Sequence, residues 1–599
     1  MLNPDARRLY SECFAAPPGH ALDCAVGTTY SLDLDSLLFA LFCLATSGVE
    51  DPDSALGNPV ALLEAIHRLS DRVTLFAHAG ETHAPERPRA LYALLERCMV
   101  PARGRGGAIF HPKAWVLRYR SRAADAVLLR VVVLSRNLTG SRAWDTFVCL
   151  EGTPGEVMCE ESRELAELLR ALPSFAVSAH HPAAARLAQL ESLAHAVERT
   201  RFEPPLPFEG AASFVALGIV PGRRFEPPAG NRLLAISPFL SPEMLAVLRA
   251  LAPRAQLVGR DEEMAKCSPE VLARWDAFVL HEGASADADV ADDSAADAAP
   301  QGLHAKALVI ESNQQATWWI GSANLTDPVR SGASVELMVR LAGKVSKVGI
   351  DPFWDAGFGS LLLTYSHHEL PPDAAEGNRS SVQRAQRRIS EATFELRCEN
   401  HAEGWCLSLE GAVPELDGVA VTCRPVSLAP SREITLAEGA GVCRFAALSA
   451  EALTAFVAFR LVAGNGDSRF ELAFTLKLPM RGLPEERDAR VASAIIKDRA
   501  AFMSYLRCLL ADFGASSAVE SQACGLEKGS ASQDEALRSA GLLESLLRTL
   551  HRDPARLHGL RTLLARCVPS SEQDVIPEEM RAVWAAIEPH LSVEGRAAE

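Results

Sequence analysis

Two segments of the sequence each place a lysine two residues after a histidine. The first reads HPK, with His111 and Lys113, and the second reads HAK, with His304 and Lys306. Lysine is rare in this chain, with 8 residues among 599, so chance is a poor explanation for two such segments. Burying a lysine is unfavourable unless an anion meets it, and the pattern therefore indicates an anion-binding site.

A second polar motif ends the apolar stretch that follows each segment. SRNLT contributes Ser135 and Asn137, and SANLT contributes Ser322 and Asn324. Lysine offers a compact positive charge, asparagine an amide donor and serine a hydroxyl, which together suit the non-bridging oxygens of a phosphodiester. The serines can instead cap the turns that follow them, and the sequence does not choose between these roles.

Two histidines in such a site can perform a two-step displacement at phosphorus. One imidazole attacks and forms a covalent phosphohistidine, while the other protonates the leaving oxygen and then activates water. Side chains two apart on a strand share a face, so each histidine and its lysine should enter the same pocket. The lysines supply the positive charge that a metal ion supplies elsewhere, and we expect no metal or other cofactor.

At these residues the chain resembles the phospholipase D superfamily. The second copy follows the superfamily pattern, with His304, Lys306 and, after four intervening residues, the acidic Glu311. In the first copy Arg118 stands where an aspartate is usual. The first copy, including the later Trp144, is therefore more similar to the tyrosyl-DNA phosphodiesterase branch, whose motif has His, Lys and Asn without the aspartate.

The resemblance implies roles for these residues. His111 would be the nucleophile and His304 the general acid and base, and a carboxylate would hold the second nitrogen of each ring. We expect Glu336 to do this in the second half and Asp145 in the first. The expected catalytic residues are His111, Lys113, Asn137, His304, Lys306 and Asn324, and the supporting residues are Ser135, Ser322, Glu336, Asp145 and Glu311.

The elements around the motifs also occur twice, and the two histidines lie 193 residues apart. Each copy alternates strand-like and helix-like segments before the motif strands, which predicts an α/β fold. We expect two phospholipase D-like halves, at 1–200 and 201–375, in a pseudo-two-fold arrangement with one site at their junction. Helical segments are predicted at 90–98 and 268–278.

The last third of the chain lies outside this repeat. Short alternating runs predict a β-sandwich-like domain at 383–482, with a hairpin at the sequence GNGD. A helical C-terminal domain is predicted at 484–599. The Ala- and Asp-rich stretch at 283–301 reads as a disordered insert.

Composition excludes several classes of protein. The net charge of −16 does not suit a protein that coats duplex DNA, although the basic run at 103–122 can form a local groove or an ordinary solvated face. The longest apolar run, at 37–45, is shorter than the roughly 18–20 residues of a membrane span. The 14 cysteines lack CxxC pairs, which is typical of reduced thiols in a cytoplasmic protein.

The sequence therefore predicts a metal-independent phosphodiesterase, most simply a nuclease or DNA-end-processing enzyme, and by analogy one that serves a bacterial defence system. The expected partners are single-stranded nucleic acid or DNA ends, and a partner protein at the C-terminal region, but no membrane. Two alternatives stay open. One is a phospholipid hydrolase or transferase, and the other is a non-catalytic phosphate-binding scaffold.

Overall fold

The computed structural model describes most of the chain. The described residues are 10–46, 52–121, 124–141, 143–281, 302–439, 441–510, 541–552 and 578–591, together with 557, 560, 561, 564 and 576. The predicted disordered insert at 283–301 and Arg122 of the basic run lie outside these ranges.

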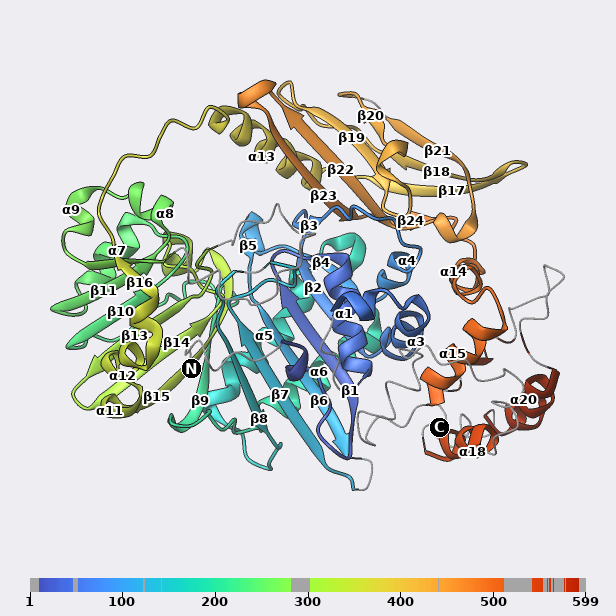
Figure 1. Cartoon of the computed structure of the whole chain (residues 1–599), viewed down its shortest axis with the longest axis horizontal. Helices are drawn as coiled ribbons and strands as arrows, with labels where there is room; N and C mark the ends of the chain where they lie inside the picture. The colour runs from blue at the N-terminus through green and yellow to red at the C-terminus, as the bar shows by residue number, and fades with distance from the viewer. Residues whose placement is uncertain are drawn as a thin grey trace.

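The first motif pair belongs to a six-stranded sheet with the order β4-β2-β1-β6-β7-β8 (Figure 1). Strands β4, β2 and β1 run parallel, and β1, β6, β7 and β8 pair in antiparallel fashion. Their bounds are β1 His20–Thr29, β2 Val73–His78, β4 Met99–Ala102, β6 Ala114–Ser121, β7 Val127–Leu134 and β8 Phe147–Gly152.

A second sheet repeats this order with β12-β11-β10-β13-β14-β15 and the same parallel and antiparallel pairs. It adds β16 (Leu362–Thr364), β9 (Glu209–Leu217) and β5 (Ile109–Phe110). The bounds of the repeated strands are β10 Arg232–Ile236, β11 Arg254–Gly259, β12 Asp276–Leu280, β13 Ala307–Ser312, β14 Gln315–Gly321 and β15 Ser334–Lys344. The predicted α/β class is confirmed.

One local prediction in this region is wrong. The segment 268–278 is helical only in α9 (Pro269–Leu272), and from Asp276 the chain already belongs to β12. The backbone there pairs with β11, a partner that lies outside the local pattern. Similarly, α4 in the first half is confined to Tyr92–Leu95 and leads into β4.

Helices cover both sheets in layers. Helices α1 (Leu34–Ala45) and α3 (Pro59–Leu69) pack on one face of the first sheet, and α7 (Pro242–Arg249) packs on the outer face of the second. Between the sheets, α5 (Arg163–Phe175) and α6 (Ala184–Val197) share one apolar core with both inner faces. This shared core holds the two halves in a single arrangement.

The halves also exchange backbone hydrogen bonds beside each histidine. Strand β5 of the first half pairs with β15 of the second, and His111 N donates to Val335 O at 2.9 Å. In the equivalent place Trp144 bridges Leu303, and His304 N donates to Trp144 O at 2.9 Å. Each histidine is therefore anchored to the segment that follows the Ser-x-Asn motif of the other half.

The C-terminal third contains two further sheets, with the orders β21-β18-β17-β24 and β20-β19-β22-β23-β3 (Figure 1). Strands β22 and β23 form the hairpin predicted at GNGD. The bounds are β17 Glu395–His401, β18 Gly404–Glu410, β19 Ala420–Pro425, β20 Ile434–Leu436, β21 Val442–Leu448, β22 Phe456–Ala463, β23 Phe470–Lys477, β24 Met480–Arg481 and β3 Thr82–His83.

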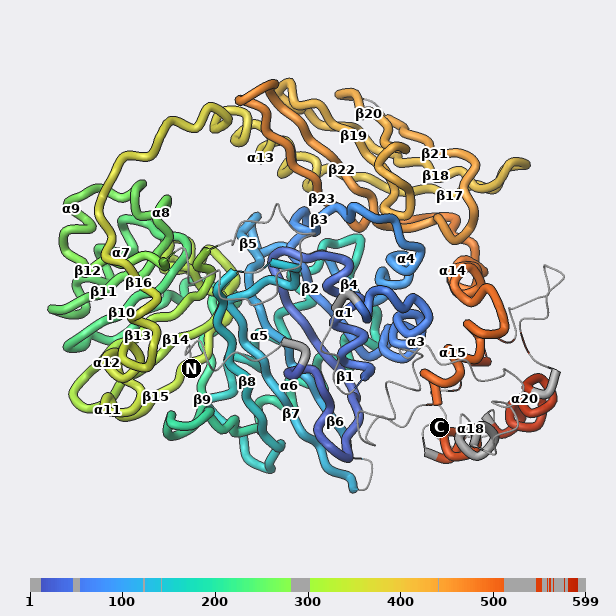
Figure 2. The backbone as a smooth tube through the Cα atoms, in the orientation of Figure 1, coloured from blue at the N-terminus to red at the C-terminus, as the bar shows by residue number. Residues whose placement is uncertain are grey.

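Two features of this region were not predicted. Strand β3 comes from the first half, and helix α13 (Glu376–Glu391) occupies the start of the expected sandwich segment and packs into its core. The helical pattern after 484 forms two helices, α14 (Arg487–Ile495) and α15 (Arg499–Leu510), followed by α18 (Gly541–Arg552) and α20 (Glu578–Leu591) (Figure 2). None of the described helices is both long and apolar enough to cross a membrane.

Glu96 joins the sandwich region to the first half. Its carboxylate accepts hydrogen bonds from Thr454 Oγ1 at 2.9 Å, Ala455 N at 2.7 Å and Arg487 at 2.7 Å. The side chain of Arg487 is only 4% exposed. A guanidinium so deeply buried needs its carboxylate partners, which are Glu96 and, at 2.8 Å, Asp488.

We expect Glu96→Ala to destabilise this junction by about 3 kcal/mol, because it removes one partner of a buried ion pair. The midpoint of urea unfolding measures the effect. The control is Arg97→Ala, which removes an ion pair to Asp488 whose arginine is 57% exposed and should change stability by less than about 1 kcal/mol. Equal effects of the two substitutions would contradict the assignment.

Candidate active site

The two histidine-lysine pairs lie at the entrances of strands, slightly before the positions that the sequence predicts. His111 and Lys113 occupy an extended stretch that ends where β6 begins, and His304 and Lys306 precede β13 in the same way. The two-residue spacing still brings both side chains of a pair together. The Lys113 Nζ atom lies 2.7 Å from His111 Nε2.

The first imidazole is held on both of its nitrogens. His111 Nδ1 lies 2.9 Å from Glu336 Oε2, and its Nε2 faces the ammonium of Lys113. The hydroxyl of Ser322 donates a hydrogen bond to the same carboxylate oxygen of Glu336. The carboxylate therefore binds the ring on the side away from the lysine, which leaves Nε2 as the reactive nitrogen.

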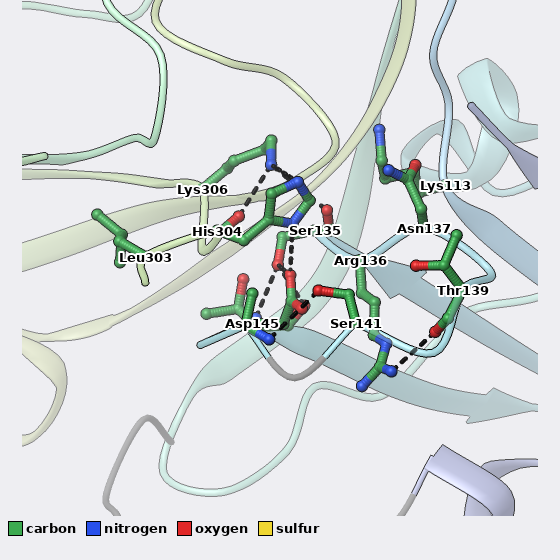
Figure 3. A network of polar contacts seen from close by, with 12 residues as sticks. Lys113, Ser135, Arg136, Asn137, Thr139, Ser141, Asp145, Leu303, His304 and Lys306 are labelled. Atoms are coloured by element: carbon green, nitrogen blue, oxygen red, sulfur yellow. Dashed lines mark hydrogen bonds and ion pairs between the residues drawn. The ribbon is translucent and has the colours of Figure 1, made fainter. Parts of the chain in front are cut away.

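The second imidazole has the same environment (Figure 3). His304 Nδ1 lies 2.7 Å from Asp145 Oδ1, and Lys306 Nζ lies 3.4 Å from its Nε2. Ser135 Oγ donates to Asp145 Oδ1 at 2.9 Å. Lys306 also reaches the first half directly, because its Nζ donates to Ser135 O at 3.4 Å.

The expected assignment of the carboxylates to the halves is wrong. Glu336, in the second half, binds the histidine of the first, and Asp145, in the first half, binds the histidine of the second. The backbone exchange described above is the cause. It sets Val335 beside His111 and Trp144 beside His304, so the next residue along each chain segment meets the opposite ring.

The serines lie behind the carboxylates. Ser135 and Ser322 are completely buried, and each accepts a backbone hydrogen bond, from Thr146 N at 2.8 Å and Leu337 N at 3.0 Å respectively. These contacts orient Asp145 and the equivalent glutamate. The sequence left two roles open for these serines, substrate contact and turn capping. Their hydrogen bonds correspond to neither role.

The asparagines border the histidine-lysine pairs. Asn137 Oδ1 accepts a hydrogen bond from Ser31 N at 3.3 Å, and Figure 3 shows this side chain beside Lys113. Asn324 Oδ1 is buried and has no hydrogen-bond partner among the described residues. Each amide group can donate its N–H bonds to an anion in the site.

Glu311, predicted as a supporting residue, lies elsewhere. Its carboxylate accepts from Ile350 N at 2.6 Å and lies 3.6 Å from Arg232, at the end of β13 far from His304. At the equivalent place in β6, Arg118 contacts Asp23 and Ser192. This position is structural in both halves, so the arginine in place of an acid does not alter the site.

The basic run at 103–122 does not line one groove. Lys113 enters the site, whereas Arg118 and Arg120 pair with Asp23 near the other end of β6. Arg103 donates to Ser390 O on helix α13. A run that follows a strand spreads its charges over several neighbours, so of the two alternatives left open by the sequence the described residues do not support a single groove.

The site carries opposing charges in a dry environment. Burial lowers the pKa of both His111 and His304 to about 4, despite the neighbouring carboxylates. Burial alone would raise the pKa of Glu336 and Asp145, but the bonded histidines and the nearby lysines hold it below its usual value. The unliganded site thus combines two carboxylates with two neutral imidazoles at neutral pH.

The two lysines couple the two halves electrostatically. Lys113 and Lys306 are 0% and 1% exposed, and burial lowers the pKa of Lys306 to about 7 and that of Lys113 well below its usual value. Each lysine also lowers the pKa of the histidine in the other half. The two lysines, the two histidines and their carboxylates therefore form one site, in which a bound anion would restore the lysine charges.

Three residues near the site were missed by the sequence analysis. The Tyr30 ring lies 5.0 Å from the His111 ring and 5.2 Å from the His78 ring, and Arg260 Nε donates to Leu303 O at 2.7 Å. They share one signal. Each follows or ends a parallel strand at its carboxyl end, where α/β sheets commonly place ligand-binding residues.

No protein-family model matches the chain, and no curated protein matches it. Among solved structures, the chain is similar to polyphosphate kinase from Porphyromonas gingivalis at a TM-score of 0.29 and 10% identity. The match covers 58% of this chain and 43% of that protein, so the chain spans less than half of the kinase. A likeness this weak supports no conclusion about fold or activity. Within the described ranges, no group of three or more His, Cys, Asp and Glu side chains is placed to hold a metal ion.

We expect sulfate, whose charge is constant between pH 6 and 9, to bind more weakly as pH rises. Lys306, with a pKa of about 7, is protonated below that pH, and above it each anion that binds must recruit a proton. The dissociation constant, measured by calorimetry, should rise by up to about tenfold per pH unit above pH 7.

Lys306→Met should weaken this pH dependence, and what remains should come from proton uptake by Lys113, whose pKa is also lowered by burial. The control is Lys266→Met, at a lysine of the same half that is 62% exposed, and it should retain the dependence. A wild-type affinity that is constant from pH 6 to 9 would contradict the proposed charge state.

Proposed function

We propose that this protein is a phosphodiesterase that forms a phosphohistidine intermediate and acts on nucleic acid. One observation carries the proposal. Two imidazoles from opposite halves each have a carboxylate on Nδ1 and a lysine on Nε2, and they belong to one buried site. Such a pair suits successive displacement at a single phosphorus atom.

In the first step His111 Nε2 attacks phosphorus while Glu336 accepts the Nδ1 proton in a hydrogen bond and stabilises the imidazolium. Lys113 turns from the ring nitrogen to a non-bridging oxygen, and the second lysine and the two asparagine amides bind the two non-bridging oxygens from the other sides. The anion raises the pKa of His304, which is then protonated and donates its proton to the leaving oxygen. The P–O bond breaks and a P–N bond forms.

In the second step the neutral His304 removes a proton from water, and the resulting oxygen attacks the phosphohistidine. The P–N bond breaks, His111 is regenerated, and the product leaves as a phosphomonoester. Asp145 stabilises the imidazolium that His304 becomes in this step. The lysines supply the positive charge throughout, and no step calls for a metal ion.

Two features support nucleic acid as the substrate. The first motif resembles that of tyrosyl-DNA phosphodiesterases. The histidines are recessed, with side chains 12% and 18% exposed. A flexible single strand or a DNA end enters such a recess more readily than a continuous duplex. Service in a bacterial defence system stays a prediction from the sequence.

The direct test incubates the protein with labelled single-stranded DNA, duplex DNA, RNA and phosphatidylcholine vesicles in EDTA. We expect cleavage of single-stranded DNA to survive chelation. The rate of cleavage should fall by about 10²–10⁴-fold in His111→Asn and in His304→Asn. The control His195→Asn changes a histidine that is 60% exposed. Turnover of phosphatidylcholine alone would favour a lipid enzyme, and no turnover would favour a scaffold.

The exchanged carboxylates predict opposite effects on the intermediate. Asp145→Asn should slow hydrolysis of the intermediate because it disturbs His304. With a nitrophenyl ester of a labelled nucleotide, whose leaving group departs without a proton, formation should continue and phosphorus-32 should accumulate on the protein. Glu336→Gln should slow its formation because it disturbs His111. Each rate should fall roughly 10–100-fold.

Label retained after an alkaline quench measures both effects, since phosphohistidine is stable to base and labile to acid. Glu311→Gln is the matched control, because that side chain bonds Ile350 N and lies away from the rings. Accumulation of label in Glu336→Gln instead would reverse the assignment of the two histidines.

A further inference from the structure

The rim of the site differs between the halves at equivalent positions. Thr29 Oγ1 donates to Ser31 O at 2.7 Å and accepts from Leu138 N at 3.0 Å. Ser237 Oγ makes the same pair of bonds, to Phe239 O at 2.7 Å and from Leu325 N at 3.0 Å. Ser31 in the first half therefore corresponds to Phe239 in the second.

A second pair of positions shows the same correspondence. His78 ends β2, and its Nδ1 accepts from Phe110 N at 3.3 Å, beside the first histidine of the site. Arg260 follows β11, and its Nε donates to Leu303 O at 2.7 Å, beside His304. An imidazole in one half thus takes the place of a guanidinium in the other.

These differences make the two rims chemically unequal. In the first half the Tyr30 ring stacks on His78, and burial lowers the pKa of that imidazole to about 4, so this pair of rings is uncharged at neutral pH. In the second half the Arg260 guanidinium carbon lies 5.5 Å from the centre of the Phe239 ring, and that phenylalanine is 41% exposed. An exposed aromatic ring beside a permanent positive charge occurs on the His304 side.

The backbone contacts place this ring and charge at the reacting groups. Leu325, which bonds Ser237, directly follows Asn324, and Leu303 directly precedes His304. The charge of Arg260 also reaches the site, because it lowers the pKa of Lys306. The ring and the guanidinium therefore border the phosphate on the side where His304 acts.

We infer that Phe239 and Arg260 form a subsite for one nucleotide, whose base stacks on the exposed phenyl ring while the guanidinium attracts the backbone. The inference rests on the proposed nuclease function and specifies its substrate. Stacking on an aromatic side chain accepts any base, because every base has a π face. Arg260 is suited to hold the Phe239 ring in place, because a guanidinium and the face of an aromatic ring attract each other.

One consequence is polarity along the strand. The nucleotide on the His304 side is held through its base. On the other side Ser31, Tyr30 and His78 are uncharged, and the Tyr30 ring is already stacked on His78. The enzyme should therefore require a base on one side of the scissile phosphate and tolerate its absence on the other.

Cleavage of modified substrates by the wild type and by Phe239 variants tests this requirement for a base. The substrates are the thymidine dinucleotide and two analogues in which one or the other nucleoside is abasic. In the wild type, one analogue should lose roughly tenfold in kcat/KM and the other less than about twofold. In Phe239→Ala this difference in kcat/KM between the analogues should disappear. In Phe239→Trp, which keeps an aromatic ring, it should persist.

Val247→Ala is the matched control, since it truncates another apolar side chain of the same half that is 40% exposed. It should keep the difference between the analogues. The subsite alone would be overturned if the wild type cleaved both abasic analogues with the same kcat/KM as the dinucleotide. It would also be overturned if the difference in kcat/KM persisted in folded Phe239→Ala. A wild type that cleaves no nucleic acid at all would overturn the proposed function, and the subsite with it.

Discussion

The burial of two lysines against carboxylates from opposite halves is the constraint on which the rest of the structure depends. Lys113 and Lys306 are almost completely buried, and an unpaired ammonium in such a place would cost several kcal/mol. Glu336 and Asp145 provide the opposing charge, and each acts through the histidine of the other half. Neither half by itself contains a balanced site.

The fold meets this constraint by docking the halves in one register. Strand β5 pairs with β15, and Trp144 bridges Leu303 in the equivalent place, so each histidine is fixed by backbone bonds from its neighbour. The apolar core between the sheets supplies the driving force for this docking. Because packed interfaces adapt poorly to small shifts, the imidazole nitrogens keep their directions before a substrate arrives.

The duplication is symmetric at the reacting groups and asymmetric around them. The C-terminal sandwich contacts the first half, where Gln386 of α13 donates to Gly80 O at 2.9 Å and β3 joins the sandwich sheet. The rims differ as well, with His78 under Tyr30 in one half and Arg260 under Phe239 in the other. A symmetric pair of displacements can therefore serve a substrate whose two sides differ.

The sequence by itself determined the α/β class, the repeated motifs, the sandwich strands and the identities of both carboxylates. The class, the motifs and the strands follow from residue types and spacings that act within about ten residues, whereas the carboxylates were expected from the family resemblance. Only the tertiary structure decided which carboxylate meets which histidine, that Glu311 and Arg118 are structural, and that Phe239 and Arg260 border the site. The physical reason is that each of these depends on pairing between segments nearly two hundred residues apart, and local periodicity carries no record of that pairing.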